Sequence, residues 1–205
     1  MTILYIAPGA CSFAAHVLVH ELDLPIQVEP VTLRTPDATI LKINPLGRVP
    51  ALQLEDGTLL TENVAILPFL ADLRPGTPLF APAGSVERAQ IQSWIGYFAT
   101  ELHAASFRPL NRPERYSADE RAHPGIRAQA RVQLFKAFEP IDRHLAGRAF
   151  LVGERFTIAD AYLGVFAGWI NRIGAEFAEL KELARFSAAF RERPAVQRAL
   201  KAEGF

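Results

Sequence analysis

The sequence predicts a mixed α/β unit with the element order βαβαββα, followed by a unit made only of helices. Strand-like and helix-like patterns alternate over the first 80 residues. A segment rich in proline and glycine follows at 73–85, as is typical of a linker. The rest of the chain has the apolar spacing of helices and no strand-like alternation. We therefore expect one unit at 1–78, a linker at 79–86 and an all-α unit at 87–205.

The composition excludes several classes of protein. The chain has 22 basic and 22 acidic residues, so its formal net charge is zero and a nucleic-acid partner is not expected. Its single cysteine excludes an intrachain disulfide and favours a reducing compartment. We see no signal peptide and no apolar run of the roughly 18 residues that a membrane span needs. The expectation is a cytoplasmic protein without a membrane partner.

The first unit is predicted to contain a parallel strand pair and a hairpin. Residues 3–7 form an apolar strand, a helix follows, and alternation over 26–33 gives a second strand parallel to the first. A short helix is expected at 37–43. Residues 49–54 and 58–61 read as a hairpin around an Asp-Gly turn.

The remaining elements are predicted as helices. Thr61 is expected to cap a helix over 62–73. In the second unit, long helices are expected at 85–108 and 124–146, and a third from about Thr157 to Asn171. Shorter helices fill the C-terminal part and are interrupted at Pro194. Thr157 and Asp160 have the spacing of a capping box, which indicates a structural role.

Cys11 lies where the first strand turns into the first helix, and we expect it in the first helical turn. Unpaired backbone N–H groups and the helix dipole stabilise a thiolate at such a position. This placement indicates a redox or thiol-binding site, although it does not by itself identify a nucleophile.

The Val49–Pro50 bond and the Glu62-Asn63 pair are the next candidate sites. Pro50 stands at the start of a strand that looks interior, where a proline is unusual. Either the Val49–Pro50 bond is cis, which leaves Val49 free to pair with an extended peptide, or the bond is trans and Pro50 opens an edge strand. Glu62 and Asn63 begin a helix, where backbone N–H groups bind anions, but they are also ordinary capping residues.

Histidines offer weaker signals. His103, on the first long helix, is open to a structural or a functional role. His16 and His20 have metal-ligand spacing, but no carboxylate or second cysteine accompanies them, so no metal is expected.

Four motifs together resemble the cytosolic glutathione transferases, most closely the bacterial beta class. They are Leu4-Tyr5-Ile6-Ala7-Pro8-Gly9-Ala10-Cys11-Ser12, Asn44-Pro45-Leu46-Gly47-Arg48-Val49-Pro50-Ala51-Leu52, Asp56-Gly57-Thr58-Leu59-Leu60-Thr61-Glu62-Asn63 and Thr157-Ile158-Ala159-Asp160-Ala161. The resemblance implies a thioredoxin-like domain, an all-α domain and a homodimer. It also implies a cis Val49–Pro50 bond and glutathione as the cosubstrate.

The resemblance further implies roles for individual residues. Val49 pairs with the cysteinyl backbone of glutathione, Glu62 and Asn63 hold its γ-glutamyl end, and His103 reaches the site from the helical domain. Cys11 lies beside the glutathione sulfur and can form a mixed disulfide with it. The resulting catalytic set is Cys11, Ser12 and His103; the glutathione-binding set is Tyr5, Leu33, Thr35, Arg48, Val49, Pro50, Glu62 and Asn63.

The chain departs from the family pattern at three positions. Leu33-Arg34-Thr35 stands where a lysine is common, Ala104 replaces a lysine after His103, and Gly96 replaces an asparagine. We therefore expect a thinner polar network around the thiol and a more open electrophile pocket, with Arg34, Arg48 or Arg108 supplying charge.

The main function implied is conjugation of the glutathione thiol to hydrophobic electrophiles, a detoxification reaction with a small-molecule partner. One alternative is a glutathione-dependent disulfide oxidoreductase acting through Cys11. Because no second cysteine can resolve a mixed disulfide, only a monothiol route is open to it. The other alternative is a non-catalytic protein that binds glutathione or hydrophobic ligands.

Overall fold

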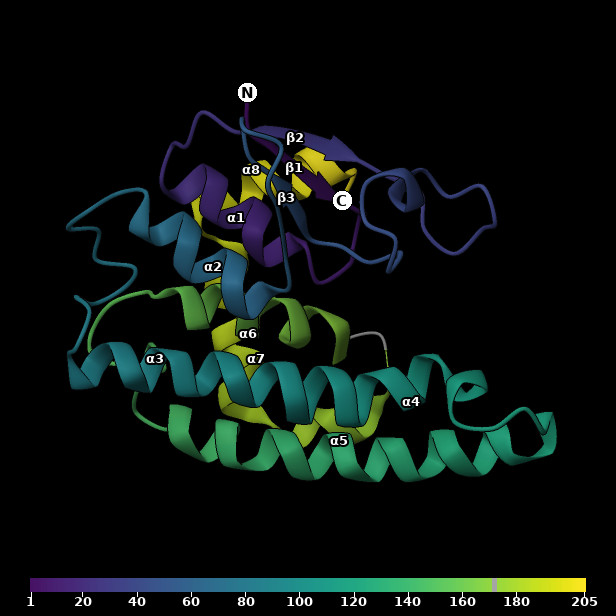
Figure 1. The fold of residues 1–205 in the computed structure, drawn as a ribbon. Helices are drawn as coiled ribbons and strands as arrows, with labels where there is room; N and C mark the ends of the chain where they lie inside the picture. Colours follow the sequence, from purple (N-terminus) through teal and green to yellow (C-terminus); the bar gives the residue numbers. More distant parts are fainter. Residues whose placement is uncertain (171–172) are drawn as a thin grey trace.

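The computed structural model describes residues 1–170 and 173–205, and it confirms the predicted fold class (Figure 1). The sheet contains β1 (Ile3–Ile6), β2 (Gln27–Pro30), β3 (Ala51–Gln53) and β4 (Leu59–Thr61) in the order β2-β1-β3-β4. β1 and β2 are parallel, as expected, and the other pairs are antiparallel.

Turn chemistry sets the register of the β3–β4 hairpin. Gly57 has a φ of 87°, which glycine adopts without steric cost, and its N–H donates to the Leu54 carbonyl at 3.0 Å. The Leu54 N–H donates to the Thr58 carbonyl at 2.8 Å and closes the turn. The predicted hairpin is confirmed, and β3 begins one residue after Pro50.

Two helices cover the sheet on the side that faces the helical unit. α1 (Phe13–Glu21) connects the parallel strands, and α2 (Asn63–Asp72) packs beside it. Cys11 was expected in the first helical turn, but α1 starts at Phe13, so Cys11 lies ahead of the helix and Ser12 takes the N-cap position. The predicted cap at Thr61 is wrong, because Glu62 occupies the N-cap of α2. The segment predicted as a helix at 37–43 is a single 3₁₀ turn, η1 (Thr39–Lys42).

The second unit begins with one long helical run. α3 (Val86–Tyr97) continues into the π-helical segment η2 (Phe98–Phe107) and then into α4 (Arg108–Asn111). Short 3₁₀ turns η3 (Pro113–Arg115) and η4 (Glu120–Ala122) lead to α5 (His123–Leu145), which runs back along the first helix. His103 lies within this π-helical segment.

α6 (Ile158–Ile170) is the helix of the second unit that packs against α1 and α2 of the first, and it is buried along most of its length. Asp160 holds its start: Oδ2 accepts from the Thr157 N–H at 2.8 Å, and Oδ1 accepts from the Leu151 N–H at 2.9 Å. The capping carboxylate is therefore confirmed, and the Thr157 hydroxyl also donates to it. The predicted helix end at Asn171 lies outside the described residues.

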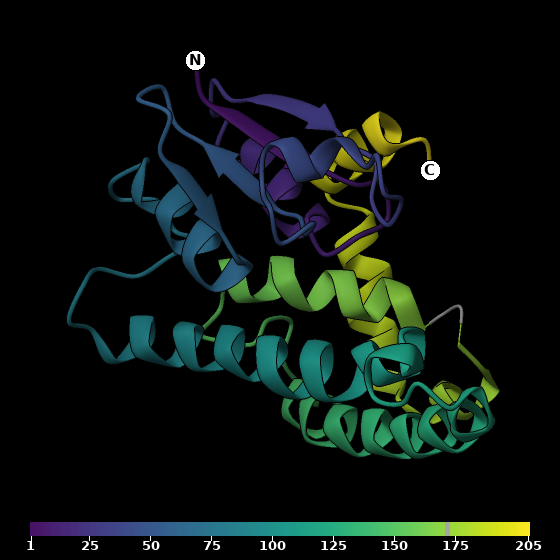
Figure 2. The same cartoon turned by 45° about the vertical axis from the view of Figure 1, so that its right-hand side comes forward.

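The last helices return to the first unit. The 3₁₀ turn η5 (Ala175–Glu179) precedes α7 (Lys181–Arg191), and α8 (Pro194–Glu203) begins at the predicted break. α8 packs against α1, which places it beside the sheet (Figures 1 and 2). One cluster of buried apolar side chains extends from Leu4 of β1 to Ala199 of α8 and joins the two units.

The described residues contain neither a candidate membrane-spanning helix nor a candidate metal-binding group. None of their helices combines the length and the apolar character that a bilayer span requires. In the same residues, His, Cys, Asp and Glu form no group of three or more that could hold a metal ion.

Candidate functional site

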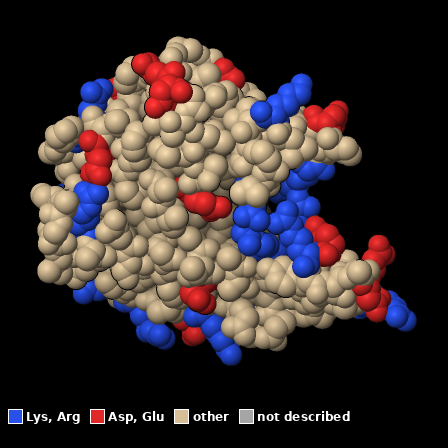
Figure 3. Space-filling model, in the orientation of Figure 1, with Lys and Arg blue, Asp and Glu red and all other residues tan. Residues whose placement is uncertain are grey.

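A cavity of about 530 Å³ lies between the sheet unit and the helical unit, and we call it the site cavity. Its upper wall comes from the loops before α1, after β2 and before β3; its lower wall comes from η2 and α4. Figure 3 shows the hollow on the right of the molecule, with blue basic side chains along its walls. The predicted site residues that line it are Cys11, Leu33, Arg48, Val49, Pro50, Glu62, Asn63 and His103.

Cys11 is a buried neutral thiol rather than an activated thiolate. Its Sγ donates to the Val49 carbonyl at 3.2 Å. Burial raises the pKa of the Cys11 thiol to about 12, and the negative charge of Glu62 adds to the rise. The expectation that the helix terminus would favour a thiolate here is therefore wrong.

Ser12 does not reach the site cavity. Its side chain is fully buried at the N-cap position of α1. The hydroxyl accepts from the Ala7 N–H at 3.2 Å and lies 3.4 Å from the Ala7 carbonyl, so it closes the turn between β1 and α1.

The Val49–Pro50 peptide bond is cis, as the resemblance implies. Asn44 supports the preceding loop, because its Nδ2 donates to the Arg48 carbonyl at 2.9 Å. The β3 ladder begins at Ala51, where it pairs with Tyr5 and Thr61, so Val49 lies at the open end of the strand and faces the cavity.

Glu62 and Asn63 form the wall next to Cys11. Glu62 has a φ of 69°, a left-handed conformation that is costly for a residue with a side chain and that often marks a functional position. Its Oε1 lies 3.7 Å from a guanidinium nitrogen of Arg48. Asn63 Nδ2 donates to the Cys11 carbonyl at 2.9 Å, while its buried Oδ1 accepts no hydrogen bond from a described residue.

His103 enters the site cavity from the π-helical segment η2. Its ring packs against the rings of Phe166 and Trp169, with centroids 5.9 and 5.6 Å away. Burial, together with the positive charges of Arg108 and Arg48, lowers the pKa of His103 to about 4. The imidazole is therefore neutral at physiological pH and can donate or accept one hydrogen bond.

Two other predicted residues are not brought to the site cavity. Tyr5 packs on the other face of the sheet and donates to Gln53 Oε1 at 3.1 Å. Thr35 is exposed on the loop after β2, next to Asp37. Several lining residues were not predicted from the sequence, among them Asn44, Arg112, Arg115 and Tyr162.

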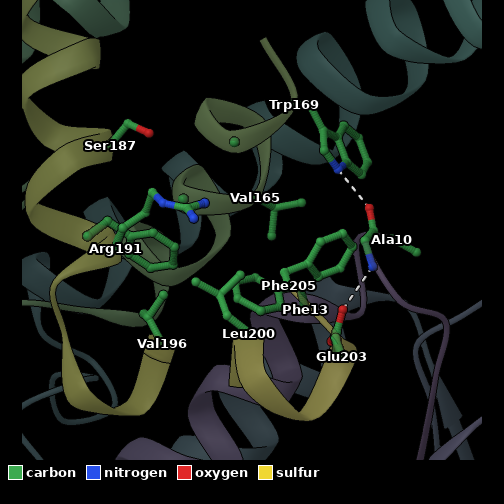
Figure 4. Close-up of a pocket in the computed structure, with 14 residues that line it drawn as sticks. Ala10, Phe13, Val165, Trp169, Ser187, Arg191, Val196, Leu200, Glu203 and Phe205 are labelled. Atoms are coloured by element: carbon green, nitrogen blue, oxygen red, sulfur yellow. Dashed lines mark hydrogen bonds between the residues drawn. The ribbon is translucent and has the colours of Figure 1, made fainter. Parts of the chain in front are cut away.

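The loop that carries Cys11 is held from two sides at Gly9 (Figure 4). The Gly9 N–H donates to Glu203 Oε2 of α8 at 2.8 Å, and Trp169 Nε1 of α6 donates to the Gly9 carbonyl at 2.9 Å. Glu203 is buried, and its other oxygen lies 2.9 Å from Nδ1 of buried His16. A second cavity, of about 130 Å³, lies behind this loop, so Gly9, Ala10 and Trp169 separate it from the site cavity.

Comparisons with known proteins agree along the chain. Family models described as the N-terminal and C-terminal domains of glutathione S-transferase match residues 9–73 and 122–202. Glutathione S-transferase GstA of Escherichia coli O157:H7 is 40% identical, with 98% of each chain covered. Glutathione S-transferase GST-4.5 of Xanthomonas campestris pv. campestris is 36% identical, again with 98% of each chain covered.

Solved structures show the same likeness. A bacterial beta-class glutathione S-transferase of Sphingomonas chungbukensis has a TM-score of 0.88 at 34% identity, with 98% of each chain covered. A sphingomonad glutathione S-transferase complexed with glutathione has a TM-score of 0.87 at 36% identity, with 99% of each chain covered.

Proposed function

Because the chain belongs to the glutathione S-transferase family and is a glutathione transferase, we propose that its site cavity holds glutathione and an electrophile side by side. The observation that supports this most directly is the meeting of Cys11, the cis Val49–Pro50 segment and Asn63 in one wall. A bound structure of a relative, the sphingomonad enzyme with glutathione, supports the choice of cosubstrate.

Glutathione lies along the upper wall in this proposal. Val49, at the open end of β3, pairs with the cysteinyl backbone as an added strand would. The γ-glutamyl end lies at Glu62 and Asn63, where the Glu62 carboxylate attracts the ligand ammonium. Leu33 and Arg48 complete the wall.

The charges of the cavity favour the thiolate of glutathione. Arg48 and Arg108 make the potential around His103 positive, and a positive potential lowers the pKa of a bound thiol. The thiolate attacks the electrophilic carbon, a carbon–sulfur bond forms, and the leaving group departs with its electron pair. The neutral imidazole of His103 offers a hydrogen bond to the sulfur, while the Cys11 S–H donates to the Val49 carbonyl.

Cys11 acts beside this reaction and does not form its covalent intermediate. A thiol with a pKa of about 12 has almost no thiolate at neutral pH, and the thiolate is the nucleophile in disulfide exchange. The monothiol oxidoreductase route is therefore disfavoured relative to conjugation.

The variant Cys11→Ala tests this assignment. We expect it to keep most of the wild-type kcat for conjugation of an uncharged chlorodinitrobenzene, within about fivefold, because it loses one neutral hydrogen bond. Glutathione binding, measured by calorimetry, shows whether the variant site is intact. Loss of conjugation in a folded variant that still binds glutathione would contradict the proposal.

The family's typical assembly leads us to propose a homodimer, with the small-molecule electrophile as the other partner. The size and protein-concentration dependence of the assembly in solution test it.

A further inference from the structure

The second cavity, behind the loop that carries Cys11, has no part in the proposed function, and we call it the rear cavity. Its volume is about 130 Å³, and residues of α6, α7 and α8 line it together with the start of α1 (Figure 4). Gly9, Ala10 and Trp169 form the wall between the rear cavity and the site cavity. A small molecule in the rear cavity therefore leaves the glutathione site unobstructed.

Most of the lining of the rear cavity is apolar. Figure 4 shows Phe13 of α1, Val165 of α6 and Leu200 of α8 around the same space. Apolar cavities of about 150 Å³ bind a benzene ring, because the ring leaves water for an apolar surrounding. The size and the lining of the rear cavity are thus those of a space for one small aromatic ring.

Two glycines of α6 show where the rear cavity has room. A Cβ added at Gly164 would lie 2.3 Å from the ring of Phe190, so α6 and α7 are closely packed there. A Cβ added at Gly168, one turn later, would meet nothing within 4 Å. The open space therefore lies beside Gly168, where a larger side chain would fill it.

The polar groups of the lining gather on α7. Ser187 and Arg191 are four positions apart and so lie on one face of the helix, opposite Trp169 in Figure 4. Ser187 is 5% exposed, and its hydroxyl has no hydrogen-bond partner among the described residues. A buried hydroxyl without a partner is costly, which indicates a position that a ligand completes.

The charge of Arg191 is also unpaired. Its guanidinium extends toward Val165 and forms no ion pair with a described residue. Glu203 lines the same cavity, but its carboxylate already accepts from the Gly9 N–H at 2.8 Å and contacts His16 Nδ1 at 2.9 Å. The rear cavity thus offers one positive charge and one hydroxyl donor at the edge of an apolar space.

We propose that the rear cavity binds a small aromatic carboxylate of about the size of benzoate. The Arg191 guanidinium matches the planar carboxylate and binds it with charge-assisted hydrogen bonds, and the Ser187 hydroxyl donates a further one. The ring lies against Phe13, Val165 and Leu200. This ligand binds without any bond being made or broken, and its binding does not depend on the reaction in the site cavity.

The experiment compares benzoate with benzamide, which has nearly the same shape without the charge. NMR follows their binding through the indole N–H signal of Trp169, which borders the rear cavity. The chain has two tryptophans, so Trp94→Phe identifies that signal. The protein is first saturated with S-hexylglutathione, which occupies the site cavity and leaves the rear cavity as the space under test.

We expect the wild type to bind benzoate about fivefold more tightly than benzamide, the effect of one exposed charge pair, and Arg191→Gln to abolish this preference. Arg143→Gln, an exposed arginine on α5, is its control. Gly168→Leu should weaken the binding of both compounds at least about tenfold, because its side chain fills the cavity. Gly125→Leu on α5, where a Cβ also meets nothing within 4 Å, should bind them as the wild type does.

Four other outcomes have definite meanings. If benzoate and benzamide bind equally, Arg191 does not select the ligand and the inference is wrong. If S-hexylglutathione abolishes binding, or Gly168→Leu leaves it unchanged, the ligand lies outside the rear cavity and the inference is wrong. If neither compound binds, the inference is also wrong. If S-hexylglutathione itself does not bind, the proposed function fails, and the same variants titrated without it still test the rear cavity.

Discussion

At the scale of the residue, burial outweighs the helix terminus at Cys11. A helix N-terminus contributes up to about 2 kcal/mol to a nearby negative charge, which corresponds to roughly 1.5 pKa units. Burial of an ionisable group shifts its pKa by as much as about 3–5 units in the opposite direction. Cys11 is also outside the helix, two residues before α1 begins. Its thiol therefore stays protonated beside the Val49 carbonyl.

This protonation predicts slow alkylation of Cys11. With a pKa of about 12, the thiolate fraction at pH of about 8 is roughly a thousandfold below that of a free cysteine with its pKa near 8.5. Iodoacetamide should therefore modify the native protein at least about a hundredfold more slowly than the urea-unfolded protein. Because the folded pKa is raised, the native rate should increase about tenfold per pH unit up to about pH 10. A rate that levels off near pH of about 8.5 would show an unperturbed thiol.

At the scale of the element, the last helix controls the loop that presents the site. Glu203 of α8 accepts a hydrogen bond from the N–H of Gly9, which stands two residues before Cys11. Gly9 and Glu203 are 194 positions apart in the chain. The same carboxylate contacts His16 of α1. α8 therefore supports the site cavity without lining it.

We expect Glu203→Ala to lower the free energy of unfolding by about 3 kcal/mol, because it leaves the buried His16 ring and the Gly9 N–H without their acceptor. The variant should also raise the KM for glutathione, since the Cys11 loop loses one of its two anchors. Urea unfolding and steady-state kinetics measure the two effects. Lys201→Ala, an exposed change on the same helix, is the control. Equal stability of the two variants would show that the Glu203 contact contributes nothing.

The sequence predicts the elements better than the contacts between them. Local sequence patterns are enough to predict the hairpin at Gly57 and the Asp160 cap, because the interacting groups are close in the chain. The family motifs are enough to predict that Val49 and Asn63 lie at the site. They do not predict Arg112 or Arg115, which reach the site cavity only because the long helical run ends at its mouth. Nor do they reveal Glu203, whose partners are far away in the sequence.

At the scale of the whole molecule, the two units share one hydrophobic core. The main buried cluster includes Leu4 and Leu52 of the sheet, Phe166 of α6 and Phe190 of α7. Phe190 packs edge-on against Phe13 of α1, with ring centroids 6.5 Å apart. Separating the units would expose these apolar surfaces to water, so neither unit is expected to be stable alone.

This shared core predicts a single unfolding transition. Far-UV circular dichroism, which follows the helices, and tryptophan emission should change at the same urea concentration, as in a two-state process. If the protein is a homodimer, the midpoint should also rise with protein concentration, because association stabilises the folded chain by mass action. Two separated transitions would show that the units unfold independently.

Trp169 has a consequence for observing the molecule at work. Its indole N–H binds the Gly9 carbonyl, its ring packs against His103, and it borders both cavities. The other tryptophan, Trp94, packs between Phe98 and His144 and lines neither cavity. The protein thus has its own fluorophore at the wall where ligands meet the Cys11 loop. With Trp94→Phe as the background, the emission of one indole reports ligand arrival on either side of that wall.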